Sequence, residues 1–164
     1  MNVNLKISVS GVRGIVGETL TPSLVADFAA SFGQYVGGGR VVVARDTRLT
    51  GGIFENAVVA GLLSVGARPV LLGIVPTPTA LVAVPSLHAN GGIIISASHN
   101  PIEWNALKFV SRAGIFLNAV EASELLDIYN QPDTSFVPEG DYRDIQTIGN
   151  IFNTHKDRIF RNID

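Results

Sequence analysis

Short strand-type runs alternate with segments of helical periodicity along most of this chain. The strand-type runs cover residues 3–9, 40–44, 68–72 and 92–96, and the helical segments begin at Thr21, Thr50, Thr77 and Asn118. Alternation of this kind requires crossover connections, which favour a mainly parallel sheet with helices on both faces. We therefore expect an α/β protein with three layers, α/β/α.

Local signals indicate where the helices begin and end. Thr21 precedes Pro22, a pattern typical of an N-cap followed by proline at the first helical position. Three glycines, 37–39, predict the end of this helix. Pro85 is expected to end or kink the helical segment 77–87. Asn118 is expected to cap the last helix, 119–129.

A hairpin and a linker complete the predicted organisation. The apolar segments 107–110 and 115–117 flank a short turn, which predicts one antiparallel strand and makes the sheet mixed. Residues 131–140 have the composition of a linker. The amphipathic stretch 145–160 then has nothing obvious to pack against within the 164 residues.

Charged residues are few and unevenly placed. The chain is 46% hydrophobic and 16% charged, whereas soluble domains usually carry about 25% charged residues. Between Asn56 and Ile102 the only charged residue is Arg68. We expect part of this surface to be covered by another domain or a partner chain. The 56–102 side should therefore expose an apolar patch or bury it against a copy of the chain.

Composition also narrows the classes of ligand and compartment. The chain has no cysteine, so a disulfide framework and a cysteine metal site are excluded. The N-terminus lacks the pattern of a secretory signal, and a cytoplasmic location is expected. No basic cluster suggests nucleic acid or a membrane surface as partner. Nine of the fourteen acidic residues lie from Glu121 onward, so the earlier part has a positive excess that suits a small anionic ligand.

Three polar loops follow predicted strands, and ligands of open α/β sheets bind at such strand ends. The loops are 10–17, 45–48 and 96–101, and they contain Arg13, Arg45 and Arg48. Converging arginines and backbone N–H groups would suit a phosphate, although each arginine taken alone could simply be solvated. The glycines of the first loop match neither the dinucleotide fingerprint nor the P-loop, and indicate only a tight, positively charged turn.

The pair Ser98-His99 is ambiguous by itself. It lacks the G-x-S-x-G context of a hydrolase nucleophile, and a histidine cannot easily act as base on its neighbour's hydroxyl. Taken alone, the pair favours a turn over a nucleophile.

Four motifs in order resemble those of the α-D-phosphohexomutase family, which includes phosphoglucomutase, phosphomannomutase and phosphoglucosamine mutase. The motifs are Ser10-Gly-Val-Arg-Gly14, Ala44-Arg-Asp-Thr-Arg48, Ser96-Ala-Ser-His-Asn-Pro101 and Asn105-Ala-Leu-Lys108. The resemblance covers residues 5 to about 140, the first domain of the family. One departure is Ala106, which stands where the family usually has glycine.

The resemblance implies that Ser98 carries a phosphoryl group, which it exchanges with a hexose phosphate through a hexose 1,6-bisphosphate intermediate. It implies Lys108 as general acid and base, with Arg13 and His99 contacting the phosphoryl group or holding the loop. Further residues implied in phosphate binding or loop ordering are Ser10, Asn100 and Arg45. Arg45 and Arg48 could also be structural or could link domains, and Asp46 is expected to be a local salt-bridge partner.

The family has four domains, so the resemblance implies that the chain is a fragment. Residues 1–140 would be the phosphoserine domain, and residues 141–164 the linker and start of the second domain. Mg²⁺ is expected to take one ligand from the Ser98 phosphate and the rest from aspartates of the missing second domain. The other three domains, the hexose phosphate and a second copy of the chain are the expected partners.

The resemblance leaves the sugar open. Phosphomannomutase or phosphoglucomutase activity is expected first, with phosphoglucosamine mutase as the alternative, and the fragment should be inactive alone. A non-catalytic sugar-phosphate-binding module is a second hypothesis. A nucleotide-binding module is disfavoured, because the fingerprint is missing.

Overall fold

A computed structural model describes residues 6–8, 11–131 and 134–161. Within them, seven strands form one sheet in the order β1-β2-β6-β5-β3-β4-β7. The strands are β1 (Lys6–Ser8), β2 (Gly11–Ile15), β3 (Gly39–Arg45), β4 (Ala67–Ile74), β5 (Gly91–Ile95), β6 (Trp104–Ser111) and β7 (Gln146–Thr147). The helices are α1 (Pro22–Tyr35), α2 (Gly51–Ser64), α3 (Thr77–Ser86), α4 (Ala119–Tyr129) and α5 (Ile151–Phe160).

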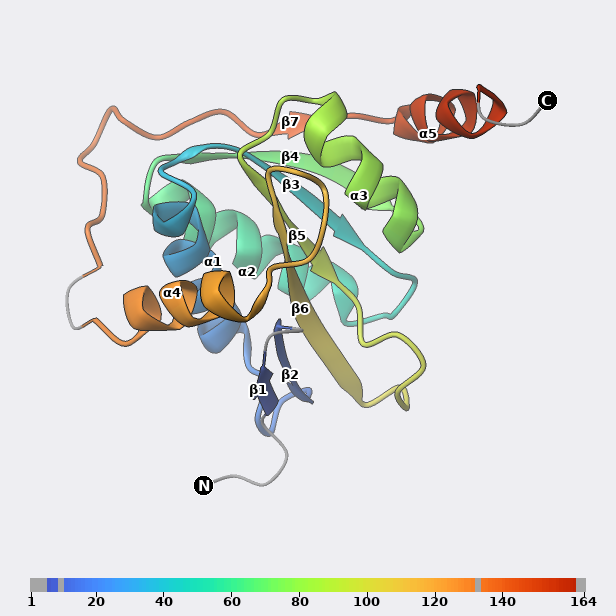
Figure 1. Ribbon diagram of the computed structural model, residues 1–164. Helices are drawn as coiled ribbons and strands as arrows, with labels where there is room; N and C mark the ends of the chain where they lie inside the picture. The colour runs from blue at the N-terminus through green and yellow to red at the C-terminus, as the bar shows by residue number, and fades with distance from the viewer. Residues whose placement is uncertain (1–5, 9–10, 132–133, 162–164) are drawn as a thin grey trace.

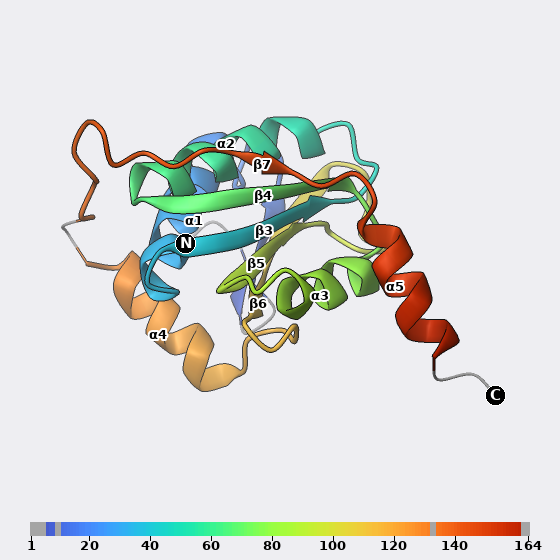
Figure 2. The same cartoon turned by 90° about the horizontal axis from the view of Figure 1, so that it is seen from above.

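The sheet is mixed, as expected. Strands β5, β3, β4 and β7 pair in parallel, whereas β1–β2, β2–β6 and β6–β5 pair in antiparallel fashion. It follows that five strands run in one direction and only β1 and β6 run against them. Figure 2 shows β7, β4, β3 and β5 side by side. Their carboxyl ends meet at one edge, where the polar loops 45–48 and 96–101 begin.

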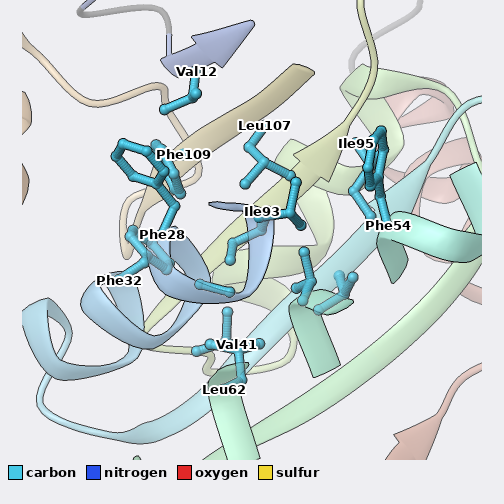
Figure 3. Packing of buried hydrophobic residues seen from close by; sticks show 14 of the residues in the cluster. Val12, Phe28, Phe32, Val41, Phe54, Leu62, Ile93, Ile95, Leu107 and Phe109 are labelled. Carbon is cyan, nitrogen blue, oxygen red and sulfur yellow. The ribbon is translucent and has the colours of Figure 1, made fainter. Parts of the chain in front are cut away.

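Helices cover both faces of the sheet (Figure 1). One core cluster joins the sheet to α1, α2 and α4, and its largest buried side chains include Phe28, Phe32 and Phe54. Figure 3 shows these rings packed among residues of the sheet. A second cluster joins the other face to α3 and α5 through Val84 and Ile151. The three-layer α/β/α architecture is therefore confirmed.

The capping signals place two of the helices as predicted. Oγ1 of Thr21 accepts a hydrogen bond from the backbone N–H of Leu24, and Pro22 begins α1. Asn118 and Glu121 form a reciprocal capping box at the start of α4, whose bounds match the prediction. Pro85 lies inside α3, which ends one residue later. Thr50 precedes α2 without a side-chain cap and accepts instead from Nδ2 of Asn105 at 3.0 Å.

Two local predictions were wrong. Residues 11–15 of the expected glycine-rich loop form strand β2, because Val12 turns into the core and Gly11 allows close approach to the backbone carbonyl of Leu107. The turn lies later, around Gly17, which has a φ of 81°. Residues 115–117 form only one bridge, between Val110 and Phe116, instead of a second hairpin strand.

The stretch 145–160 does find a packing surface, contrary to expectation. It supplies β7 beside β4 and helix α5, in which Ile151 is buried in the second core cluster. Oγ1 of Thr79 and Nδ1 of His155 lie within hydrogen-bonding distance at 2.9 Å, which ties α3 to α5. The domain boundary near residue 140 stays a prediction.

The weakly charged side of the chain is not uniformly polar. Ile74 and Ile102 are 55% and 73% exposed, and Leu49, just before this region, is 91% exposed. Ile74 is the last residue of β4, whereas Leu49 and Ile102 lie in the segments that follow β3 and β5. Among the described residues no helix is long and apolar enough to span a membrane.

Candidate functional site

Ser98 lies in the loop that follows β5, at the carboxyl edge of the sheet. A cavity of about 170 Å³ opens beside it. Its lining combines backbone and side chains of three strands with the start of the loop. The lining residues are Lys6, Ser8, Gly11, Arg13, Ser96, Ala97, Ser98, Ala106 and Lys108.

Strand register brings three cations to this cavity. Arg13 on β2 is the register partner of Lys6 on β1 and of Ala106 on β6. Lys108 lies two residues beyond Ala106, and alternate residues of a strand share a face. Like charges on neighbouring strands repel one another, unless an anion lies between them. No carboxylate is among the described residues that line the cavity, so its electrostatics favour an anionic group.

The surroundings of Lys108 shift its pKa. Burial lowers the pKa of its ammonium below the usual lysine value, Arg13 lowers it further, and the carboxylate of Asp46 acts in the opposite direction. Its Nζ also lies 5.9 Å from the ring centre of Phe116. A lysine of lowered pKa offers a larger neutral fraction near neutral pH, which a general base needs.

The backbone of Ser98 is held in an unusual conformation. Its φ is 58°, in the left-handed region that few non-glycine residues adopt. The Ser98 N–H donates to Oγ of Ser96 at 3.1 Å, and Nδ2 of Asn100 donates to the carbonyl of Ala97 at 2.6 Å. Asn100 thus orders the turn. Oγ of Ser98 lies 3.4 Å from Nδ1 of His99, a long contact for a hydrogen bond.

Arg48 clamps the loop from outside. Its guanidinium donates to four backbone carbonyls, those of Ser98 (3.1 Å), Asn100 (2.7 Å), Pro101 (2.8 Å) and Trp104 (3.1 Å). Nε forms a salt bridge of 3.3 Å with Asp46, which is therefore the local partner that the sequence predicted. Arg48 is a positioning residue for the loop that carries Ser98.

The remaining predicted residues either do not line the cavity or fall outside the described residues. Nε of Arg45 donates to Glu55 at 3.0 Å, and Arg45, His99 and Asn100 are not among the lining residues. Ser10 falls outside the described residues. Sequence reasoning did not assign Lys6 or Ser96 to the site. The alternation of polar and apolar residues over 3–9 predicts a strand that contains Lys6. Only the pairing of β1 with β2 shows that Lys6 is the register partner of Arg13.

The described residues do not by themselves form a site for Mg²⁺. No group of three or more histidine, aspartate or glutamate side chains that could hold a metal occurs among them. Mg²⁺ prefers several oxygen ligands, commonly carboxylates combined with a phosphate. The cavity at Ser98 offers hydroxyls and cations instead.

Comparisons with known proteins agree with this arrangement. Residues 4–135 match the model of phosphoglucomutase/phosphomannomutase, alpha/beta/alpha domain I. Phosphoglucosamine mutase of Clostridium kluyveri is 39% identical over 140 residues, which cover 82% of this chain and 29% of that protein. Phosphoglucosamine mutase of Bacillus pumilus is 37% identical over 147 residues, covering 87% and 32% respectively.

Solved structures show the same fold. A provisionally assigned phosphomannomutase from Thermus thermophilus aligns with a TM-score of 0.84 at 27% identity, over 100% of this chain and 37% of that one. A phosphoglucomutase/phosphomannomutase family protein from Burkholderia thailandensis aligns with a TM-score of 0.74 at 26% identity, over 96% and 36% respectively. This chain spans about a third of the length of these relatives. It belongs to the phosphoglucomutase/phosphomannomutase family and corresponds to its α/β/α domain I.

Proposed function

We propose that this chain is the phosphoserine-bearing domain of a phosphohexomutase, which moves a phosphoryl group between two hydroxyls of a hexose phosphate. One observation carries the proposal: Ser98 lies at a cavity that Lys6, Arg13 and Lys108 line with positive charge. A phosphoserine brings a charge of roughly −1.5 to −2 at neutral pH, and these cations would neutralise it.

Each half-reaction exchanges one phosphorus–oxygen bond for another. In the first, a sugar hydroxyl attacks the phosphorus of phosphorylated Ser98, and the bond from phosphorus to the serine Oγ breaks. The neutral amine of Lys108 accepts the hydroxyl proton, and the ammonium so formed passes a proton to Oγ of Ser98 as that oxygen leaves. The product is a hexose 1,6-bisphosphate. After this intermediate turns over in the site, Ser98 attacks its other phosphate, and the proton transfers run in reverse.

Positioning supplies much of the catalysis in this scheme. Arg48 fixes the loop backbone, and Asn100 fixes the turn, so that Oγ of Ser98 stays beside Arg13 and Lys108. Arg45 stays a candidate for phosphate contact, and His99 for contact or for holding the loop. A phosphorylated Ser98 would also offer one oxygen to Mg²⁺, whose carboxylate ligands would have to come from outside the described residues.

We propose a hexosamine phosphate as the first substrate to test. The support is the pair of phosphoglucosamine mutases from Clostridium kluyveri and Bacillus pumilus, whereas the sequence alone favoured a mannose or glucose phosphate. The chain alone is expected to be inactive, because it spans only about a third of these relatives. The corresponding enzyme is expected to be cytoplasmic.

Intact-mass spectrometry of the enzyme that carries this domain tests the proposal. The unmodified enzyme should carry one phosphoryl group and lose it in Ser98→Ala, together with mutase activity on glucosamine phosphate. Ser96→Ala changes the neighbouring serine of the same loop and should keep the phosphoryl group. A Ser98→Ala enzyme with full activity would refute the proposal. Binding of sugar phosphate without turnover by the unmodified enzyme would favour the binding-module hypothesis instead.

A further inference from the structure

We propose that a second anion site lies at the opposite edge of the sheet from Ser98, and that it binds a small molecule with a phosphate monoester. A cleft of about 830 Å³, here called the amino-edge cleft, opens where β3 and β4 begin. Figure 2 shows the end of α4 and the segment after it at the same end of the sheet as these strand starts. The lining residues are Gln34, Gly37, Gly38, Gly39, Arg40, Val65, Gly66, Arg68, Ile128, Gln131, Ser135, Val137, Asp141 and Arg143.

Two arginines of the amino-edge cleft lie side by side. Arg40 on β3 and Arg68 on β4 are register partners in adjacent parallel strands, so their side chains leave the same face of the sheet. Like charges in this position repel each other. Arg143 adds a third guanidinium from the segment after α4. An anion between these groups would relieve the repulsion.

The arginines have hydrogen-bonding capacity to spare. Nε of Arg68 is buried and has no hydrogen-bond partner among the described residues. Arg40 uses Nη1 on the carbonyl of Leu87 at 3.2 Å. In the described part of the chain, the salt bridges are Arg45–Glu55 and Arg48–Asp46, so none of the three cleft arginines has a carboxylate within 4.0 Å. A buried donor without an acceptor is unfavourable, and a small rotation of the Arg68 side chain toward an oxyanion in the cleft would satisfy it.

Charge and volume favour a phosphate monoester as the occupant. Three arginines and Asp141 give the described lining a formal charge of +2, which matches the dianion of a phosphate monoester. Guanidinium groups bind phosphate through two parallel hydrogen bonds. The volume falls in the range of about 300–1,000 Å³ that is typical of small-molecule sites, so there is room for an organic group beyond the phosphate.

The glycines beside Arg40 keep the cleft open. Gly37, Gly38 and Gly39 have φ values of 69°, 74° and 78°, a left-handed run that side chains rarely adopt. A Cβ on Gly37 would meet no atom within 4 Å. The chain therefore passes this side of the cleft without placing a side chain over the arginines.

Helix compensation is the competing explanation for the arginines. Helices α1 and α2 end at this edge, and cations near a helix C-terminus offset the partial negative charge of its carbonyls. In that case the arginines would stabilise the fold and would not respond to phosphate. The two explanations therefore differ in what an added anion does.

Titration of the 164-residue chain with inorganic phosphate, followed by calorimetry and thermal unfolding, separates them. All measurements start from the double variant Arg13→Gln/Lys108→Gln, in which anion binding to the cavity at Ser98 is weakened because two of its cations are removed. This double variant should still bind phosphate and gain thermal stability from it. Adding Arg68→Gln and Arg143→Gln should weaken phosphate binding at least tenfold, whereas Arg112→Gln, in an exposed turn, should not change it.

Three results would overturn the proposal. Loss of all phosphate binding in the Arg13→Gln/Lys108→Gln background would assign the anion site to the Ser98 cavity alone. A lower melting temperature in Arg68→Gln, with an unchanged phosphate response, would assign the arginines to helix compensation. Equal affinity of the Arg13→Gln/Lys108→Gln variant for inorganic phosphate and for a sugar phosphate would contradict the claim that the amino-edge cleft binds an organic group. None of these results bears on the phosphorylation of Ser98, which is tested separately.

Discussion

Replacing Arg48 with alanine should loosen the loop that carries Ser98 while leaving the sheet intact. Two of the four carbonyl hydrogen bonds of Arg48, to Asn100 and Trp104, are partly buried, and the other two are exposed. At about 1–1.5 kcal/mol for each partly buried bond and little for the exposed ones, the ordered loop loses about 2–3 kcal/mol. Its population relative to open forms should then fall by a factor of about 30–150.

Amide hydrogen exchange measures this change directly. The Ser98 and Asn100 amides donate to Ser96 Oγ and to the Ala97 carbonyl, and their protection should fall by up to the same factor. Arg48→Lys should recover only part of the protection, because one ammonium cannot reach four carbonyls in a fixed fork. Arg112→Ala serves as the control. Unchanged protection of both amides in a folded Arg48→Ala chain would refute the clamp.

The other predictions concern Lys108 and Gly11. Lys108→Gln should lower the turnover of the full enzyme about 10²–10⁴-fold, which an activity assay measures. The phosphoryl group should remain on Ser98, which intact-mass spectrometry measures. Unchanged turnover would show that Lys108 does not transfer the proton. The pKa of Lys108 is lowered in the folded chain, so between the folded pKa and 10.5 the unfolded chain binds more protons than the folded chain. The free energy of unfolding should therefore rise with pH across this range. Lys108→Met should remove this increment from urea denaturation curves. Gly11→Ala should lower the free energy of unfolding, measured in urea, by about 3 kcal/mol, because the φ of Gly11 is 109° and a Cβ would collide with the Leu107 carbonyl. The control is Gly149→Ala, where a Cβ would meet no described atom within 4 Å and the free energy should change little. Equal losses in the two variants would contradict the steric argument.

Much of the architecture could be predicted because it follows from local patterns. Thr21 and Asn118 cap their helices through bonds to residues two or three positions away, and such signals are visible in the sequence. Strand β2 escaped prediction because its two glycines resemble a loop. Its strand character comes from pairing with β6, some 90 residues later in the chain. Long-range pairing of this kind leaves no local signal.

The candidate site was predictable to the same extent. The motifs singled out Ser98, Arg13 and Lys108, and the structure brings these three to one cavity. Lys6 was missed because its position depends on the β1–β2 register. The role of Arg48 was left open because its partners are backbone carbonyls, which every residue has and no motif can reveal.

Arg48 has a consequence for the catalytic cycle proposed above. The hydrogen-bond donors of its guanidinium are occupied by backbone carbonyls and by Asp46, so they are not directed at the phosphoryl group. Lys6, Arg13 and Lys108 line the cavity beside the Ser98 side chain, and they would respond to its charge. The shape of the loop is thereby separated from its electrostatics. Ser98 could gain and lose a dianion in each turnover while the backbone that presents its oxygen keeps the same form.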